Sequence, residues 1–259
     1  MTRAYRLPMT VIRPTLAEPP LVLALDVGTS SARALLFDRR GRALRGVKAH
    51  VPYAPHTTLD GGAELDPRFL FAAVCGVLDG CLGRAGARAK EIRGVATSMF
   101  WHSLIGIDRD AKPVTPCYTW ADTRSWEAAA VLRERLDEQS VHARTGCPLH
   151  TAFFPARLRW LSLRHPGTFE RARTWGGFWE YLALRLFGSS TSSLSMASAT
   201  GLLDQVRCAW DPEILAISGI DQGRLFPLAG VEARLGGLRK AFARRWPPLA
   251  EVQIGRAHV

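Results

Sequence analysis

The strongest constraint on the fold lies near the start of the chain, where two apolar runs flank a turn of small residues. The first run, residues 21–26, reads LVLALD, and the second ends at Asp38 after ARALLFD. Between them stand glycine, threonine and two serines, at residues 28–31. Short apolar runs bounded by turn residues are typical of β-strands. A third extended segment follows at 43–53, so the pattern predicts a strand meander whose first strand is buried on both faces.

Helical patterns dominate the rest of the chain. Asp66 is a good N-cap, and Pro67 suits the first position of a helix whose apolar residues recur at helical spacing up to residue 82. Further strands are expected at 92–99 and 103–108, further helices over 125–136, 155–163, 178–187 and 235–246, and a serine-rich loop over 189–198. The order of elements predicts an α/β fold in one domain.

The first turn carries groups suited to phosphate chemistry. The strand before it delivers the Asp26 carboxylate to the sheet edge, the turn exposes backbone N–H groups with the hydroxyls of Thr29, Ser30 and Ser31, and Arg33 follows in the next strand. N–H groups and hydroxyls hold anionic oxygens, and a carboxylate orients hydrated Mg²⁺. Without other information, an ordinary hairpin with an Asx-type turn explains the same residues.

Six segments in order resemble the FGGY family of carbohydrate kinases, which are relatives of hexokinase, actin and the heat-shock ATPases. They are DVGTSSARALLFD from Asp26, GGAELDP from Gly61, GVATSMFWHSLIGID from Gly94, TWADTRS from Thr119, ARTGCPLHTAFFPARLRWL from Ala143, and SMASATGLLD from Ser195 followed by Trp210 and Asp211. Single motifs of this kind are weak evidence, but six in register are strong.

The resemblance implies the first of two lobes, a ribonuclease-H-like α/β domain of the actin and hexokinase type with a mixed sheet and flanking helices. It implies the sugar-binding domain at 21–253 and a tail unlike the family at 254–259. Residues 1–20, which contain arginines and prolines but no apolar run long enough for a signal peptide, are expected to be a flexible leader. The resemblance also implies ATP and Mg²⁺ as cofactors and a cytoplasmic location. The second lobe, which in the family holds most of the ATP site, is expected to be missing.

Carried over by position, the resemblance assigns two groups of residues. Those expected at the nucleotide phosphates are Asp26, Thr29, Ser30, Ser31 and Arg33, with Asp26 also holding the metal through water. Those expected at the sugar are Trp101, His102, Trp120, Asp122 and Phe153. Aromatic rings beside a carboxylate and an imidazole provide an apolar platform with hydroxyl partners, which suits a polyol.

Other roles are open for several of these residues. His102 fits a core histidine at a strand end, Trp120 fits a core position, and Asp122 fits an N-cap for the helix after it. Arg124 fits a pair with a neighbouring carboxylate. Ala152 stands where glycerol-type members have a tyrosine, which argues against glycerol as a substrate.

The motifs most resemble the gluconokinase-like members, so gluconate is the expected sugar, with xylulose or ribulose as alternatives. The family's catalytic aspartate is expected beyond the C-terminus, because RRWPPLAEVQ leads towards it but IGRAHV follows. The chain alone is therefore expected to be inactive. A non-catalytic sugar-binding or regulatory module is the alternative.

The chain is basic, with a formal net charge of +11 over 259 residues. Such a balance suits a nucleic-acid partner, but the arginines are scattered and no nucleic-acid motif is present, so no such partner is expected. The five cysteines form no Cys-x-x-Cys pair, which argues against a disulfide framework and a zinc site. No stretch is expected to be long and apolar enough to span a membrane.

Overall fold

The computed structural model describes residues 10–230 and 232–256 of the chain. The described residues divide into two compact units, where the sequence predicted one domain. The first unit comprises residues 10–52, 73–98 and 234–256. The second comprises residues 53–72, 99–230 and 232–233. The candidate phosphate residues lie in the first unit, and the candidate sugar residues lie in the second.

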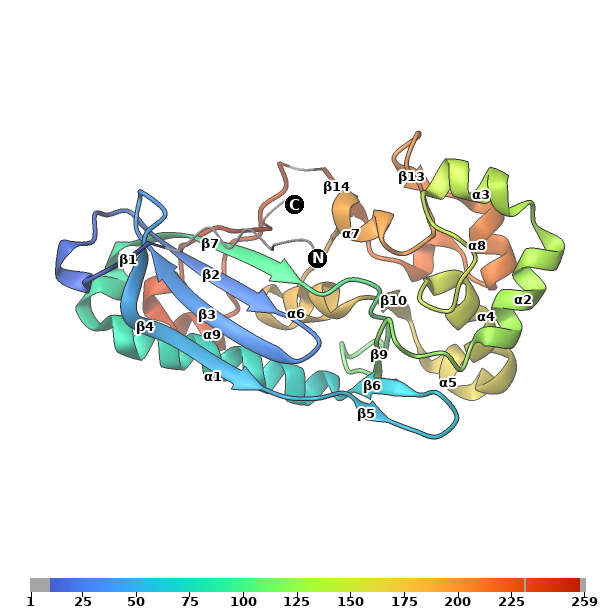
Figure 1. Ribbon diagram of the computed structural model, residues 1–259, viewed down its shortest axis with the longest axis horizontal. Helices are drawn as coiled ribbons and strands as arrows, with labels where there is room; N and C mark the ends of the chain where they lie inside the picture. The colour runs from blue at the N-terminus through green and yellow to red at the C-terminus, as the bar shows by residue number, and fades with distance from the viewer. Residues whose placement is uncertain (1–9, 231, 257–259) are drawn as a thin grey trace, which may run out of the picture. The chain divides into compact units, whose positions relative to one another are not determined.

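The first unit is built on a six-stranded mixed sheet in the order β1-β4-β3-β2-β7-β15 (Figure 1). Its strands are β1 (Val11–Ile12), β2 (Leu21–Val27), β3 (Ser31–Phe37), β4 (Ala43–Pro52), β7 (Ile92–Met99) and β15 (Ile254–Arg256). β2, β3 and β4 pair antiparallel in chain order, as the meander predicted, whereas β1 and β15 pair parallel with their neighbours. This mixed sheet confirms the α/β prediction.

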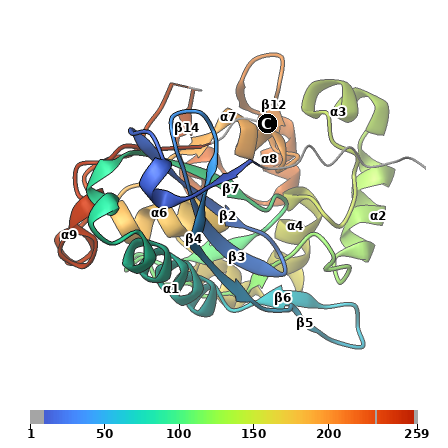
Figure 2. The same cartoon turned by 60° about the vertical axis from the view of Figure 1, so that its left-hand side comes forward.

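Helical segments accompany this sheet. They are α1 (Pro67–Ala85), α9 (Lys240–Arg245) and the 3₁₀ turns η1 (Pro14–Leu16), η2 (Gly86–Glu91) and η4 (Pro247–Leu249). The part of α1 that belongs to this unit lies along β4, where the Cys81 thiol is 3.9 Å from the Val47 carbonyl oxygen (Figure 2). The Asp79 carboxylate on α1 accepts hydrogen bonds from Arg245 and Trp246, which anchor the end of α9.

Three expectations for this unit are wrong. β2 is not buried on both faces: Leu21, Leu23 and Leu25 are buried, while the alternate side chains stay partly exposed, as is usual in an antiparallel pair. Part of the expected leader, Val11–Ile12, pairs with β4, while residues 1–9 lie outside the described residues. The expected basic helix over 235–246 is limited to the six residues of α9.

The prediction that no stretch reaches membrane-spanning length is also wrong. Among the described residues, one helical stretch, Pro67–Glu91, is long and apolar enough by length and composition, with a mean hydropathy of 1.5 in its best window. This observation is weak evidence for a membrane, because the core helices of globular proteins pass the same test. Leu70, Val74 and Val77 of α1 are fully buried, as the helical spacing predicted.

The second unit combines short strands with most of the helices. Its helices are α2 (Trp126–Arg135), α3 (Glu138–Thr145), α4 (Phe154–Arg164), α5 (Pro166–Arg171), α6 (Phe178–Phe187), α7 (Leu194–Ser198) and α8 (Pro212–Ser218), with the 3₁₀ turn η3 (Gln222–Arg224). Its strands are β5 (His56–Thr57), β6 (Ala63–Leu65), β8 (Ile105–Ile107), β9 (Cys117–Tyr118), β10 (Thr174–Gly176), β11 (Ser192–Ser193), β12 (Leu203–Asp204), β13 (Ala209–Trp210) and β14 (Leu228–Ala229). The stretch 189–198 is therefore not a plain loop, because it contains β11 and α7.

Helix α4 lies at the centre of the second unit's core. It packs against α2, α5 and α8, and both Leu158 and Leu161 are fully buried (Figures 1 and 2). The same core includes Leu104 beside β8 and Tyr118 in β9. The segments next to these strands, residues 101–103 before β8 and residues 119–125 after β9, are thus held against the helical layer.

Candidate functional site

The turn between β2 and β3 is a tight hairpin, as the sequence predicted. The Gly28 N–H donates to the Ser31 carbonyl oxygen at 2.9 Å, so residues 29 and 30 form the tip, where Ser30 is exposed and Thr29 is half-buried. Ser31 is buried. Asp26 and Arg33 are directly opposed across the two strands, and their charged groups approach to 4.0 Å. The Arg33 guanidinium also donates to the Ser31 hydroxyl.

This hairpin fits a hydrated Mg²⁺ and a phosphate better than it fits a direct metal site. The described residues contain no group of three or more His, Cys, Asp or Glu side chains placed to hold a metal ion. Mg²⁺ bound with nucleotides keeps several waters and takes one or two carboxylates, so the half-exposed carboxylate of Asp26 is of the right kind.

His102 has an unusual backbone conformation for a residue with a side chain. Its φ is 56°, in the left-handed region, which costs roughly 1–2 kcal/mol for a non-glycine residue. Strain of this kind is often found at functional sites. Its Nδ1 lies 2.7 Å from the Ala199 carbonyl oxygen. Since a carbonyl only accepts, Nδ1 carries the proton and Nε2 of the neutral ring is an acceptor.

The protonation state of His102 follows from its surroundings. Burial lowers the pKa of the imidazole, and the nearby charge of Arg157 lowers it further, while the hydrogen bond to Ala199 acts in the opposite direction. The net pKa is below the ordinary value. The ring is therefore neutral at physiological pH, with Nε2 able to accept a hydrogen bond from a hydroxyl group.

Aromatic rings gather beside His102. The ring of Phe153 lies edge-on at a centroid distance of 5.0 Å, and the ring of Trp101 at 6.1 Å. Trp101 is 43% exposed, and Trp120 is 57% exposed, so Trp120 is not a core residue. The structure thus brings Trp101, His102 and Phe153 into contact, and both tryptophans present open ring surface of the sort that polyols bind.

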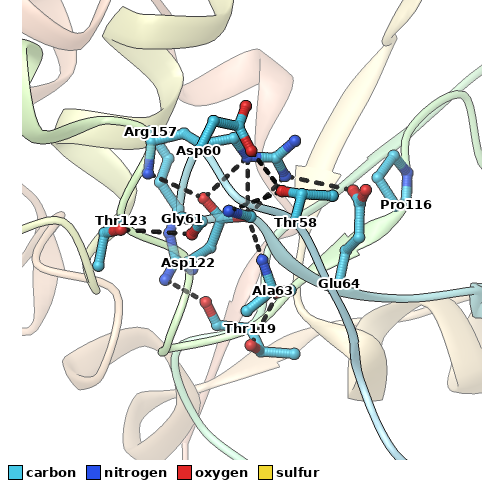
Figure 3. Close-up of polar contacts among 12 residues, drawn as sticks. Thr58, Asp60, Gly61, Ala63, Glu64, Pro116, Thr119, Asp122, Thr123 and Arg157 are labelled. Atoms are coloured by element: carbon cyan, nitrogen blue, oxygen red, sulfur yellow. Dashed lines mark hydrogen bonds and ion pairs between the residues drawn. The ribbon is translucent and has the colours of Figure 1, made fainter.

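Asp122 is directed into the protein. It is 2% exposed, and its two carboxylate oxygens accept hydrogen bonds from the Ala63 N–H and from the backbone and guanidinium of Arg124 (Figure 3). It does not cap the next helix, whose N-cap is Ser125. Because both oxygens are occupied by donors of the chain itself, a direct contact between Asp122 and a sugar stays a prediction.

Arg124 forms ion pairs with neighbouring carboxylates, which is the role considered for it from the sequence. Its guanidinium lies 2.6 Å from Asp122 and 3.3 Å from Glu64, and it stacks over the rings of Tyr118 and Trp160. Burial by itself would lower the pKa of Arg124, but the hydrogen bond and charge of Asp122, with those of Glu64, raise it. This network ties segment 119–125 to strand β6.

Sequence reasoning missed Arg157, in the first turns of α4. The residue is 1% exposed, and its guanidinium donates to the carbonyl oxygens of His102 and Thr119, each at 2.5 Å (the Thr119 contact is shown in Figure 3). Burial lowers the pKa of Arg157 to about 10, and the charge of Asp122 partly offsets that effect, so the side chain stays charged. The sequence feature that could have revealed it is an arginine on the same helix face as the core positions Phe154, Leu158 and Leu161.

A small, mostly apolar cavity opens beside His102. Its lining includes Ser103, Trp175, Glu180 and Ser192. The space for water-sized molecules is about 20 Å³. That volume suits one water molecule, which needs about 10–15 Å³ of such space. A sugar is far larger, so a sugar bound here would rest against the exposed rings and not inside the cavity.

Comparison with known proteins identifies the fold. Residues 21–255 match the FGGY family of carbohydrate kinases, N-terminal domain. The match includes residues 254 and 255, so the expectation that the family's domain ends at residue 253 is wrong. The structure resembles the crystal structure of gluconate kinase from Lactobacillus acidophilus, with a TM-score of 0.82 and 27% identity, over 91% of this chain and 48% of that one. The ribonuclease-H-like fold class predicted from the sequence is thereby confirmed.

Two curated relatives show how much of a kinase the chain spans. The gluconokinase of Bacillus licheniformis is 32% identical over 212 residues, which are 82% of this chain and 40% of that protein. The xylulose kinase of Streptomyces rubiginosus is 34% identical over 212 residues, which are 81% of this chain and 42% of that protein. The chain therefore spans less than half the length of these relatives.

Proposed function

Because the chain belongs to the FGGY family of carbohydrate kinases, we propose that it is the sugar-binding domain of an ATP-dependent kinase that phosphorylates a hydroxyl of gluconate. The observation that carries this proposal is the group of exposed or half-buried rings of Trp101, His102 and Phe153 in the second unit. Such a group offers apolar faces for the C–H side of a sugar and a fixed acceptor for one of its hydroxyls.

Each residue has a distinct part in binding. Trp101 and Trp120 supply open ring surface, and Phe153 packs edge-on against the imidazole and restricts its orientation. His102 accepts a hydroxyl hydrogen at Nε2, because the Ala199 carbonyl already holds the Nδ1 proton. The alternative substrates, xylulose and ribulose, would use the same groups. The chain is about equally identical to the gluconokinase and to the xylulose kinase, at 32% and 34%, so sequence identity does not decide between these substrates.

The hairpin of the first unit is proposed to take part in holding ATP. The backbone and hydroxyls of Thr29 and Ser30 contact phosphate oxygens, and Arg33 adds positive charge. Ser31, whose side chain is buried and accepts a hydrogen bond from Arg33, holds that arginine beside the turn. Asp26 orients Mg²⁺ through water. When bound, the ion neutralises charge on the transferred phosphoryl group.

Phosphoryl transfer also needs a base for the acceptor hydroxyl. The proposal places that base, with the remainder of the ATP site, in the part of FGGY kinases that this chain does not span. The 259-residue chain by itself is thus proposed to bind sugar without transferring phosphate, in the cytoplasm. A non-catalytic sugar-binding role for the chain predicts the same binding.

The test is calorimetric titration of the purified chain with gluconate, xylulose, ribulose and glycerol. Gluconate is expected to bind most tightly and glycerol not at all. Trp101→Ala and Trp120→Ala are expected to lower gluconate affinity at least about fivefold, since each ring removed is worth roughly 1–3 kcal/mol by analogy with other ring-stacked ligands. Trp126→Ala removes an equally exposed tryptophan that belongs to neither predicted segment, and is the matched control.

The outcomes separate the alternatives. Tighter binding of xylulose or ribulose would replace gluconate as the substrate but keep the sugar-binding role. If Trp126→Ala lowers gluconate affinity as much as Trp101→Ala and Trp120→Ala do, then Trp101 and Trp120 do not form the sugar-binding surface. ATP-dependent phosphorylation of any of these sugars by the chain alone would overturn the placement of the catalytic base.

A further inference from the structure

Arg157 joins the two segments that carry the predicted sugar-binding side chains. One terminal nitrogen donates to the His102 carbonyl, and the other donates to the Thr119 carbonyl, both at 2.5 Å. The second carbonyl belongs to the peptide that leads into Trp120. All of these residues lie in the same compact unit. A single guanidinium thus fixes the peptide after His102 and the peptide before Trp120.

Packing alone does not account for an arginine at this position. The side chain is buried among apolar core residues of α4, where a leucine or methionine fits the helical pattern equally well. Its guanidinium donates to main-chain carbonyls and not to a carboxylate, among the described residues, and its Nε has no hydrogen-bond partner there. A buried charge without a directly bonded counter-ion is costly to maintain.

The two bonds act on features that matter for binding. The His102 carbonyl belongs to the residue with φ of 56°, so the bond helps to hold the conformation in which Nδ1 reaches Ala199. The Thr119 carbonyl lies at the start of the segment whose other end is held by the pair of Asp122 and Arg124. The guanidinium thus bonds to the main chain of both segments, at the residue that carries the His102 ring and at the peptide before Trp120.

We propose that Arg157 is a positioning residue, which holds His102 and Trp120 in the arrangement that receives the sugar. The proposal rests on the proposed sugar-binding function but assigns no sugar contact to Arg157 itself. A planar guanidinium suits this task because its two terminal nitrogens point at two acceptors at once.

The chain offers a matched control in the same unit. Arg224 is half-buried, whereas Arg157 is fully buried, and the Arg224 guanidinium too donates to two carbonyl oxygens, those of Phe169 and Ala172. Neither of these carbonyls lies in a segment predicted to contact sugar. Arg224→Met therefore also removes two hydrogen bonds from a guanidinium to main-chain carbonyls, without touching the candidate site.

The experiment compares the wild-type chain with Arg157→Met, Arg157→Lys and Arg224→Met. The indole N–H signals of Trp101 and Trp120 are followed by ¹⁵N NMR, with assignments from single Trp→Phe variants, and gluconate affinity is measured by calorimetry. Arg157→Met is expected to shift or broaden the Trp120 and Trp101 signals in the free protein and to lower the affinity at least tenfold. Arg224→Met is expected to lower the melting temperature and to leave both signals and the affinity as in the wild type.

Arg157→Lys keeps the charge but has one nitrogen for two carbonyls, so its affinity is expected to fall between those of the wild type and Arg157→Met. If Arg157→Met does not fold, this variant decides the matter: wild-type signals and wild-type affinity in Arg157→Lys overturn the proposal. Equal effects of Arg157→Met and Arg224→Met on the indole signals overturn it as well. If the wild-type chain binds no sugar, the proposed function fails, and the indole signals still test the positioning role.

Discussion

The buried carboxylate of Asp122 gives the sharpest test of how the candidate site is built. In Asp122→Ala, the Ala63 N–H loses its acceptor and Arg124 loses its shortest ion pair, at 2.6 Å. Arg124 keeps its contact with Glu64 at 3.3 Å. Its side chain is 16% exposed, so water compensates for only a small part of the loss.

The expected magnitude follows from that geometry. Removing one partner of a buried ion pair costs about 3–5 kcal/mol, because a buried charge is left behind. The remaining Glu64 contact sets the expectation at the lower end, about 3 kcal/mol. In a chain of this size each kcal/mol lowers the melting temperature by about 2–4 °C, so a fall of about 6–12 °C is expected.

The matched control is Glu64→Ala. Glu64 makes one longer contact with the same guanidinium and is more exposed, so its removal is expected to cost at most about 1 kcal/mol. Thermal unfolding and urea unfolding of both variants measure the difference. A loss in Asp122→Ala no larger than in Glu64→Ala would refute the reasoning. If Asp122→Ala keeps wild-type stability but loses sugar binding, then Asp122 contacts the sugar directly, as the sequence predicted.

Three further predictions concern single groups. Stability should decline as the pH falls below about 6.5, because the unfolded chain then binds a proton that the folded His102 does not. Because the pKa of His102 in the folded chain is lower, sugar affinity should stay constant from pH 8 to about 6.5 and fall only at a more acidic pH. Titrations across this range measure both. Gly201→Ala should destabilise the chain by about 1–2 kcal/mol, because φ is +76° and the new Cβ would lie 3.1 Å from Phe153. The control Gly83→Ala, in helix α1, meets no neighbouring atom and should be neutral or stabilising; urea unfolding compares the two variants. Burial raises the pKa of Asp38, but hydrogen bonds from the Arg42 guanidinium and from the backbone outweigh it and hold the pKa well below the usual value. The ionised carboxylate therefore stabilises the fold fully above about pH 4, and this stabilisation is lost as the pH falls further. Asp38→Asn should make the acid unfolding curve flatter in that range.

The sequence predicted the local parts of the fold well. The hairpin of β2 and β3, the start of α1 at Pro67 and helix α6 all follow from short-range patterns of apolar and turn residues. The parallel additions to the sheet, β1 and β15, were missed. Each contributes only two or three residues, and their pairing depends on partners far away in the chain, which a local pattern does not encode.

In the candidate site too, features marked by adjacent residues were predicted and features that depend on distant residues were missed. Trp101 and His102 were singled out because a motif of adjacent residues marks them, and the structure places their rings in contact with Trp101 exposed. Their contact with a sugar stays a prediction. The direction of the Asp122 side chain was not predictable, since its partner Ala63 is 59 residues away. Arg157 looks from the sequence like one more arginine on a basic helix, and only the fold shows that it is buried.

The two arginines beneath the candidate site are both committed to the protein itself. Arg124 is paired with Asp122 and Glu64, and Arg157 holds two main-chain carbonyls. Neither guanidinium is therefore free to take up the carboxylate of a sugar acid. The rings and the neutral imidazole are proposed to bind hydroxyl and C–H groups, which gluconate and xylulose share. It follows that a preference for gluconate over xylulose must come from groups other than these two arginines, and the difference between the two affinities measures what those groups contribute.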